Sequence, residues 1–529
     1  MLGALLLACA VTAAPIAQPT ARIDYATLVG KRTFPGNDSI AVDAFLGIPY
    51  AQAPVKELRF ALAVPVTAQI GTLNASSFKP ACMQSIPAEF SDFYPTGASE
   101  DCLYINVWTP PNSKLGDDLP VMVWTHGGYF TVGGTAEFIY NGANTVYSSI
   151  QSNQKIIFVS YAYRLSVFGF STANLGLLDQ KFAFEWIRKH IHKFGGDRKN
   201  VAAAGESAGA FSIGHHMTSS LAILNENHVK FPLFDKAILQ SGAVSSIMAN
   251  CSALTPQFSA IVSAANCTNT TSAIECLRKL SPEALLAAGA SGASSSGIPF
   301  QTCIDGSYLL ENPFIALSKG KFAKIPLLTG YNTNEGTAFA VGIQTAAAFD
   351  ALVPQALPYL TASEQADIYT QYPLANYSSP FLAASALFGD FSFVCPSKIM
   401  ASAFAAEVPT FSYCFNKAPN ATTDDFLFWG PGTSFLGASH GSEIIYTFDD
   451  LAQLKTDQER ALAKEISSYW ISFVHSGNPN KHFGASSATV WPLLASGKRV
   501  RFDEAGMVIE TAEDESNQCG VWKRIFEKY

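Results

Sequence analysis

Short, nearly continuous apolar runs alternate along the chain with longer amphipathic segments. Six of the runs predict buried strands, at residues 119–125, 155–161, 201–204, 234–239, 325–328 and 410–414. Runs without polar alternation are typical of strands that are covered on both faces. Residues 179–193 and 455–474 instead repeat apolar side chains at helical spacing. This order predicts the α/β class, with a large, mostly parallel central sheet and helices on both faces.

The composition suits a chain with a large buried core. Of the 529 residues, 48% are hydrophobic and only 14% are charged, which excludes an intrinsically disordered or low-complexity protein. The formal net charge is −8, and no basic stripe is visible, so we expect no nucleic-acid partner. Because no internal repeat or long linker interrupts the pattern, we predict one domain over residues 18–529.

The first 17 residues have the features of a secretory signal peptide. A short leucine- and alanine-rich run is followed by small residues, and it is too short to span a bilayer. No basic residue precedes the run, and a buried N-terminal helix is the alternative. We expect cleavage between Ala13 and Ala17 and an extracellular protein. No apolar tail precedes Tyr529, so no membrane anchor is predicted.

Glycosylation sequons are consistent with export, although chance produces several in any long chain. The candidate asparagines are Asn37, Asn74, Asn250, Asn266, Asn269, Asn376 and Asn420.

The strongest local signal is the spacing of Gly205, Ser207 and Gly209. The apolar run 201–204 precedes it and residues 210–217 can form a helix, which is the strand–turn–helix context of a nucleophilic serine. The tight turn strains the Ser207 backbone, and the glycines leave room for the crossing strand and helix. The helix N-terminus also favours developing negative charge. A structural glycine turn is the alternative, and the context favours a catalytic serine.

A reactive serine needs a base and an acid that orients the base, and in this arrangement they follow in the order acid, then histidine. The histidines after the serine are His215, His216, His228, His440, His475 and His482. We favour His440, because the small-residue loop 437–442 can place its imidazole freely. Glu335 is the preferred acid, since it lies in the loop after a predicted strand. Asp305 and Asp390 are weaker candidates, because no comparable strand runs into either.

Backbone amides after an earlier strand are expected to bind the oxyanion. Gly128 and Tyr129 follow the predicted strand 119–125, and Ala208 follows the serine. His126 precedes the serine and lies beside glycines, so we interpret it as structural.

Several motifs together resemble the type-B carboxylesterase/lipase family, which includes secreted fungal lipases and esterases and the cholinesterases. The matching segments cover essentially the whole mature chain: residues 45–54, 58–60, 100–107, 163–165, 176–180, 194–209, 334–336 and 439–441. The resemblance implies an α/β-hydrolase fold and hydrolysis of carboxylic esters without a metal or organic cofactor. It also implies that Ser207, Glu335 and His440 are the catalytic triad, with Gly128, Tyr129 and Ala208 as oxyanion donors.

Two positions near the triad need separate comment. Tyr129 stands where the family usually has a third glycine. Its amide N–H is retained, but we expect its ring to crowd the acyl pocket or to move the loop. Glu206 matches the family and either tunes His440 or a water molecule, or is a structural buried carboxylate.

The resemblance also implies three disulfides, Cys82–Cys102, Cys267–Cys276 and Cys395–Cys519. Loss of Cys9 with the signal leaves nine cysteines. Cys251, Cys303 and Cys414 are therefore left open, with at least one thiol free or paired between chains.

The 19 residues between Cys82 and Cys102 correspond to the family's lid, and they include Phe90, Phe93 and Tyr94. A flap this short exposes little apolar surface, so we favour a carboxylesterase over a strictly interfacial lipase. Triacylglycerol lipase, sterol esterase and an esterase for aromatic acyl groups are alternatives, and a cholinesterase is less favoured because nothing identifies a choline cage. A non-catalytic binding protein on the same fold is the remote alternative.

Overall fold

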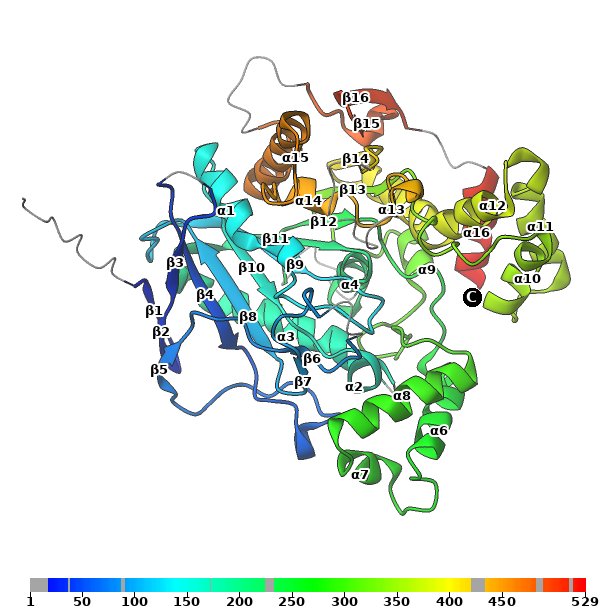
Figure 1. The fold of residues 1–529 in the computed structure, drawn as a ribbon, viewed down its shortest axis with the longest axis horizontal. Coiled ribbons are helices and arrows are strands. Elements are labelled where there is room, and N and C mark those ends of the chain that lie inside the picture. The colour runs from blue at the N-terminus through cyan, green and yellow to red at the C-terminus, as the bar shows by residue number, and fades with distance from the viewer. Residues whose placement is uncertain are drawn as a thin grey trace, which may run out of the picture.

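The protein is built around one large mixed sheet of 11 strands (Figure 1). The computed structural model describes residues 18–36, 39–86, 91–171, 173–223, 233–419, 433–481, 489–512 and 517–529. From one edge to the other, the strands are β16 (Gly506–Thr511), β15 (Lys498–Asp503), β14 (Thr410–Phe415), β13 (Leu327–Asn332), β12 (Lys236–Gln240), β11 (Gly196–Glu206), β9 (Leu119–Thr125), β10 (Ile157–Tyr161), β8 (Tyr104–Thr109), β4 (Val42–Pro49) and β3 (Lys31–Thr33). The predicted signal peptide, residues 1–17, lies outside the described residues.

The central strands are parallel and the outer strands are antiparallel. Parallel pairing runs without interruption from β10 through β9, β11, β12, β13 and β14 to β15. Antiparallel pairs join β8, β4 and β3 at one margin and β16 at the other. All six predicted apolar runs form central strands, so the sequence predicted the parallel core of the sheet. A smaller sheet combines β1 (Thr20–Ile23), β2 (Ala26–Val29) and β5 (Gly71–Asn74).

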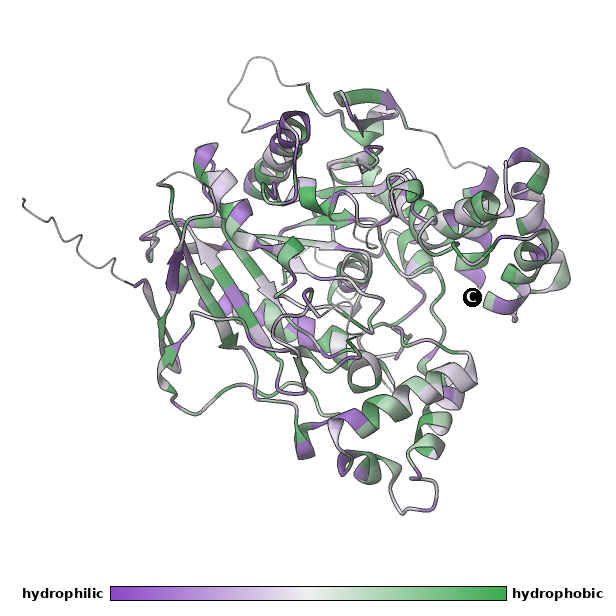
Figure 2. Ribbon diagram, in the orientation of Figure 1, coloured by the Kyte–Doolittle hydropathy of each residue, from purple (hydrophilic) through white to green (hydrophobic). Residues whose placement is uncertain are grey.

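Alternate residues of each central strand enter two separate cores, because successive side chains point to opposite faces. On β9, Val121 and Val123 belong to one core, whereas Met122 and Trp124 belong to the other. The first core contains side chains of α3 (Leu175–His190) and α4 (Ala208–Met217), and the second contains those of α1 (Gly142–Gln151) and α15 (Asp457–Ser476). In Figure 2 the sheet strands carry green, pale and some purple residues, and α15 carries both green and purple, as an amphipathic covering helix should.

Further helices pack around this centre, and two groups of them extend from it in Figure 1. The remaining helices are α2 (Ser166–Phe170), α5 (Ser220–Ile223), α6 (Thr255–Ala264), α7 (Ala273–Arg278), α8 (Pro282–Ser296), α9 (Pro313–Ser318), α10 (Ala346–Ala356), α11 (Ala362–Gln371), α12 (Pro380–Gly389), α13 (Cys395–Ala405), α14 (Ile444–Thr447) and α16 (Asn517–Lys528). A π-helical turn, Asp390–Val394, joins α12 directly to α13. In the part of the chain described above, no helix is both long and apolar enough to cross a membrane.

Four disulfides join cysteines of the described residues. They are Cys82–Cys102, Cys267–Cys276 and Cys395–Cys519, as the family resemblance implied, and Cys251–Cys303, whose pairing the sequence left open. Cys414 is buried and has no disulfide partner among the described residues.

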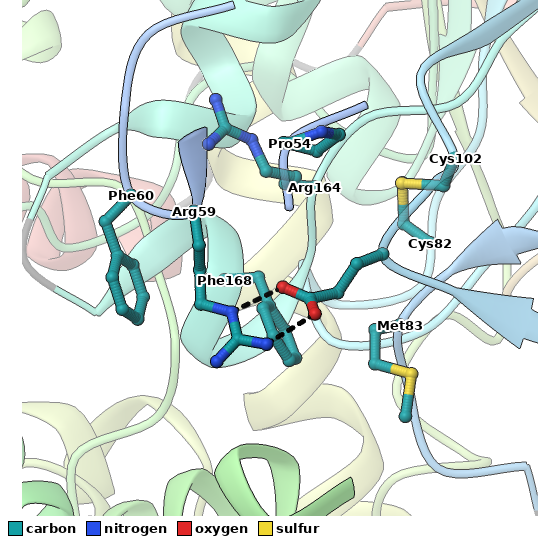
Figure 3. Close-up of a pocket in the computed structure, with 9 residues that line it drawn as sticks. Pro54, Arg59, Phe60, Cys82, Met83, Cys102, Arg164 and Phe168 are labelled. Carbon is teal, nitrogen blue, oxygen red and sulfur yellow. Dashed lines mark hydrogen bonds and ion pairs between the residues drawn. A yellow bond between two sulfur atoms is a disulfide. The ribbon is translucent and has the colours of Figure 1, made fainter. Parts of the chain in front are cut away.

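The base of the Cys82–Cys102 loop is fastened at several points. The short strands β6 (Ala81–Cys82) and β7 (Ala98–Ser99) pair across it. Arg59 binds Glu100 through two hydrogen bonds of 2.6 and 2.5 Å beside the disulfide (Figure 3). The cavity between these side chains holds about 10 Å³, which is room for one water molecule at most, so it is no substrate pocket.

Candidate active site

Ser207 occupies a strained turn between β11 and α4. Its backbone angles are φ 56° and ψ −126°, a combination that a residue other than glycine rarely adopts. The strand β11 lies in the middle of the parallel sheet, so Ser207 lies at the carboxyl edge where ligands of such sheets usually bind. The strain persists because β11 and α4 are both locked into the core.

The glycines of the motif have steric reasons that the structure makes explicit. A Cβ at Gly209 would lie 2.0 Å from the carbonyl oxygen of Thr125, and one at Gly205 would lie 2.8 Å from the carbonyl carbon of Gly209. Helix α4 therefore passes so close to β9 and β11 that only glycine fits at either position. This close approach is the reason for the G-x-S-x-G spacing.

Glu335 and His440 meet although 105 residues separate them. Nδ1 of His440 lies 2.6 Å from Oε2 of Glu335, and both side chains are buried. The second carboxylate oxygen of Glu335 accepts a hydrogen bond of 2.7 Å from the backbone N–H of Asn332, at the end of β13. Both oxygens of Glu335 are thus engaged, which fixes the carboxylate and the edge of the imidazole that faces it.

The opposite edge of the imidazole faces the serine turn. Nε2 of His440 lies 3.1 Å from Oε1 of Glu206, the residue directly before Ser207. Burial penalises the charged imidazole, but the carboxylates of Glu206, Glu335 and Glu443 outweigh that penalty and raise the pKa of His440 to about 9. Burial, reinforced by Glu443 and Glu335 against the attraction of His440, raises the pKa of Glu206 to about 8.

Two residues that the sequence did not single out hold the acid and histidine loops together. The side-chain amide of Asn332 donates to the carbonyl of Ser439 at 2.7 Å and to Oε2 of Glu443 at 2.6 Å. Glu443 is buried and also accepts a hydrogen bond from Gln240 at the end of β12. The position of Glu443, three residues after His440, was the only signal in the sequence that could have identified it.

The loop after β9 lies beside Ser207, as expected for oxyanion donors. A Cβ at Gly127 would lie 3.0 Å from Cβ of Ser207. Gly128 has φ +100°, and a Cβ there would lie 2.1 Å from the carbonyl oxygen of Val132, so glycine is required. Tyr129 follows in the left-handed region at φ 61°, where glycine is also preferred, and 48% of its surface is exposed. Its side chain is therefore partly exposed, while its ring centroid lies 6.0 Å from that of Phe339.

The other histidines and acids considered from the sequence have different partners. Nδ1 of His126 lies 2.9 Å from the carbonyl of Gly127, and burial lowers its pKa to about 4. His215 and His216 lie within α4, and burial lowers the pKa of each to about 3. His475 contacts the carbonyl of Gln154, Asp305 accepts from Asn174 and Ser307, and Asp390 accepts from Tyr372. His228 and His482 lie outside the described residues.

Aromatic rings line the surroundings of His440. Phe393 stacks on the imidazole with a centroid distance of 4.1 Å, and Phe339 meets it edge-on at 5.4 Å. Phe388 stacks on Phe339 at 4.8 Å, Phe211 stacks on Phe393 at 6.0 Å, and Tyr129 lies 6.0 Å from Phe339. We call these five residues the aromatic wall. No motif in the sequence marked Phe393, Phe339, Phe388 or Phe211.

Within the described ranges, no group of three or more histidine, cysteine, aspartate or glutamate side chains is placed to hold a metal ion.

The chain is similar throughout its length to known ester hydrolases. A family model described as the carboxylesterase family matches residues 17–522. An acetylcholinesterase of Bungarus fasciatus is 32% identical over 504 residues, which cover 86% of this chain and 78% of that protein. Secreted lipase 1 of Botryotinia fuckeliana is 30% identical over 521 residues, which cover 88% of this chain and 87% of that protein.

A solved structure confirms the fold. The crystal structure of Aspergillus niger EstA superposes with a TM-score of 0.83 at 28% sequence identity, covering 96% of this chain and 98% of that chain. The predicted α/β-hydrolase fold is therefore confirmed. With a family match over residues 17–522, this chain belongs to the carboxylesterase family and is a serine ester hydrolase.

Proposed function

We propose that this protein is a secreted carboxylesterase that hydrolyses esters through an acyl-enzyme on Ser207. The observation that carries the proposal is the position of His440, whose Nδ1 lies 2.6 Å from Glu335 and whose Nε2 edge faces the strained turn at Ser207. A buried acid, an imidazole and a serine in this order are the parts that acyl transfer needs.

The reaction proceeds in two steps that share the same groups. His440 takes the proton of the Ser207 hydroxyl as the oxygen attacks the ester carbonyl, and Glu335 stabilises the imidazolium that results. The amides of Gly128, Tyr129 and Ala208 donate to the oxyanion. His440 then protonates the departing alcohol, and water attacks the acyl-enzyme by the reverse sequence of proton transfers. These three amides have no hydrogen-bond acceptor among the described residues, which supports their role as donors to a bound oxyanion.

The flap between Cys82 and Cys102 supports an esterase more than a strictly interfacial lipase. Gln84 donates to the carbonyl of Gly133 at 2.7 Å and accepts from the N–H of Gly133 at 2.9 Å, which binds the flap to the loop after β9. Phe93 packs on Phe138 at 4.9 Å instead of pointing outward as part of an open apolar face. Phe90 lies outside the described residues. A flap held in this way does not need an oil surface to become active.

The aromatic wall bears on the acyl half of the substrate. Rings beside His440 give an apolar surface that accommodates an aliphatic or aromatic acyl group. A triacylglycerol lipase is the second candidate, because a relative is named a secreted lipase.

Extracellular location is supported by three independent features. Four disulfides are typical of an oxidising compartment. The sequon asparagines within the described residues, Asn74, Asn250, Asn266, Asn269 and Asn376, are all exposed. Asn37 and Asn420 lie outside the described residues. The similarity to a protein named a secreted lipase is the third feature.

The decisive experiment compares secreted protein with its Ser207→Ala variant on graded esters. We expect the substitution to lower turnover by ~10⁴–10⁶ on every substrate. Near-full activity of the variant would contradict the assignment. The panel runs from acetyl to long-chain p-nitrophenyl esters, with phenolic-acid esters, acetylthiocholine and a triacylglycerol emulsion. A jump in rate when substrate exceeds its solubility limit would favour the lipase candidate.

A further inference from the structure

We propose that Phe393 is a positioning residue for His440, and that the π-helical turn Asp390–Val394 exists to place its ring. The inference rests on the proposed function, because it assigns a role through the catalytic imidazole. Its described ring contacts are with His440, Phe339, Phe388 and Phe211, and of these His440 is the titratable group of the site, so we assign the role of Phe393 through His440.

Phe393 covers one face of the imidazole without competing for its nitrogens. The two rings lie 4.1 Å apart between centroids with 29° between their planes, and Phe393 is 1% exposed. Glu335 holds the Nδ1 edge, and Phe339 meets the ring edge-on at 61°. A phenyl ring offers no hydrogen-bond donor or acceptor. It therefore limits rotation of the imidazole and excludes water from that face while both nitrogens stay available.

The π turn explains how a helix that runs past the site can present this side chain. A π turn holds one more residue than an α turn, so it shifts the phase of the following helix by about 100°. Before the turn, α12 packs against the acid loop: a Cβ at Gly336 would lie 1.9 Å from the carbonyl oxygen of Ser385. After it, α13 begins at Cys395, which is bonded to Cys519 of α16. The extra residue lets both neighbours keep their contacts while Phe393 faces His440.

Contacts from other elements compensate the irregular backbone of the turn. The hydroxyl of Ser246 donates to the carbonyl of Phe391 at 2.6 Å. The hydroxyl of Tyr372 donates to Oδ2 of Asp390 at 2.9 Å and accepts from the indole N–H of Trp522 at 2.9 Å. Widened helical turns of this kind are frequent at functional sites. Hydrogen bonds from several elements therefore stabilise the π turn at residues 390–394.

The face-on ring also favours the charged state of His440 that forms during catalysis. The negative face of a phenyl ring attracts a cation, and the attraction strengthens where water is excluded. The carboxylates of Glu206, Glu335 and Glu443 supply the larger part of the field at the imidazole. Asp390, on the turn itself, is bonded to Tyr372. Phe393 adds a further attraction, which stabilises the imidazole only when it is charged.

The test is Phe393→Leu, with Phe388→Leu as the matched control. Phe388 belongs to the same wall and lies 6.3 Å from Phe393, but it has no ring contact with His440 among those described. We expect Phe393→Leu to lower kcat about 10-fold with little change in KM, because the lost contact matters when the imidazolium forms. In the pH profile of kcat/KM, we expect the acid limb to shift to lower pH by about half a unit. Phe388→Leu should change KM and leave the limb in place.

A second variant acts on the turn instead of the ring. Ser246→Ala removes the hydrogen bond to the Phe391 carbonyl, and we expect it to move the acid limb in the same direction by a smaller amount. If the thermal melting curve shows that Phe393→Leu does not fold, Ser246→Ala becomes the test of the proposal. The proposal would be overturned if the acid limb of folded Phe393→Leu stayed at the wild-type pH. If Phe393→Leu does not fold, an unchanged limb in Ser246→Ala would overturn it. Failure of the proposed function is separately visible, because Ser207→Ala would then retain activity.

Discussion

Replacing Glu206 with glutamine removes a carboxylate whose Oε1 lies 3.1 Å from Nε2 of His440. In the proposed mechanism, His440 must be neutral to accept the Ser207 proton, so we expect kcat/KM to rise with pH through the pKa of His440. The negative charge of Glu206 raises that pKa. Its removal must therefore lower the pKa and move the acid limb of the profile to lower pH.

The magnitude follows from the charges around the imidazole. Burial lowers the pKa of His440, but Glu206, Glu335 and Glu443 together raise it to about 9; Glu206 exerts the largest single coulombic effect, and Glu335 acts through both its charge and its hydrogen bond. An opposite charge this close shifts a pKa by about 1–3 units. We expect the acid limb to fall by about 1–2 units, which corresponds to about 1.4–2.7 kcal/mol. Because the pKa of Glu206 is itself raised to about 8, the wild-type limb reports a coupled pair, whereas the variant should follow a single ionisation.

The assay is kcat/KM for p-nitrophenyl acetate from pH 5 to pH 10, on the wild type, Glu206→Gln and a control. Asp449→Asn is the control, because Asp449 is also a buried carboxyl with a raised pKa but is bonded to Ser148, and we expect no change of the limb. Glu443→Gln should give a smaller shift in the same direction. A Glu206→Gln limb that stays in place or moves up would refute the electrostatic reasoning.

Two further predictions concern stability and the oxyanion loop. The Cys395–Cys519 bridge closes a loop with a sequence separation of 124, which corresponds to about 5 kcal/mol, so Cys519→Ser should lower the apparent melting temperature by about 4–5 °C at a fixed scan rate. The Cys267–Cys276 loop has a sequence separation of 9, so we expect Cys276→Ser to lower the melting temperature by about half as much. Equal shifts for the two variants would contradict the loop-length argument. Tyr129→Gly relieves the positive φ of 61° and keeps the amide, so kcat for acetyl esters should stay within about threefold; a loss above 100-fold would show that the ring itself is needed.

The parts of the fold that the sequence predicted depend on neighbouring residues. Residues 119–125 form β9 as expected, because a strand buried on both faces is apolar at nearly every position. The outer strands β3, β4, β8, β15 and β16 were missed. The residues of β3 and β16 are all only partly buried or exposed, so their hydrophobic pattern is weak, whereas β4 and β8 are almost wholly buried.

In the candidate site, too, the sequence predicted the features set by neighbouring residues and missed those set by packing. The glycines at positions 205 and 209 identified the serine turn, because the close approach of α4 to β9 leaves no room for a Cβ. Phe393 could not be found in this way. A phenylalanine in an apolar helix is ordinary core in the sequence, and only the π turn and the packing of α12 decide that its ring lies on His440.

The sequence by itself determined the class of the protein, a parallel α/β sheet of the carboxylesterase family with a strained serine turn, and it supplied Glu335 and His440 as the proposed acid and base. These features are encoded locally, by apolar runs, glycine spacing and strand ends. Only the tertiary structure decided which side chains surround His440, which cysteine pairs with Cys251, and that the ring of Tyr129 lies near Phe339. Such contacts join residues far apart in the chain, 105 positions in the case of Glu335 and His440. They depend on how the whole sheet and its covering helices pack, which no local pattern records.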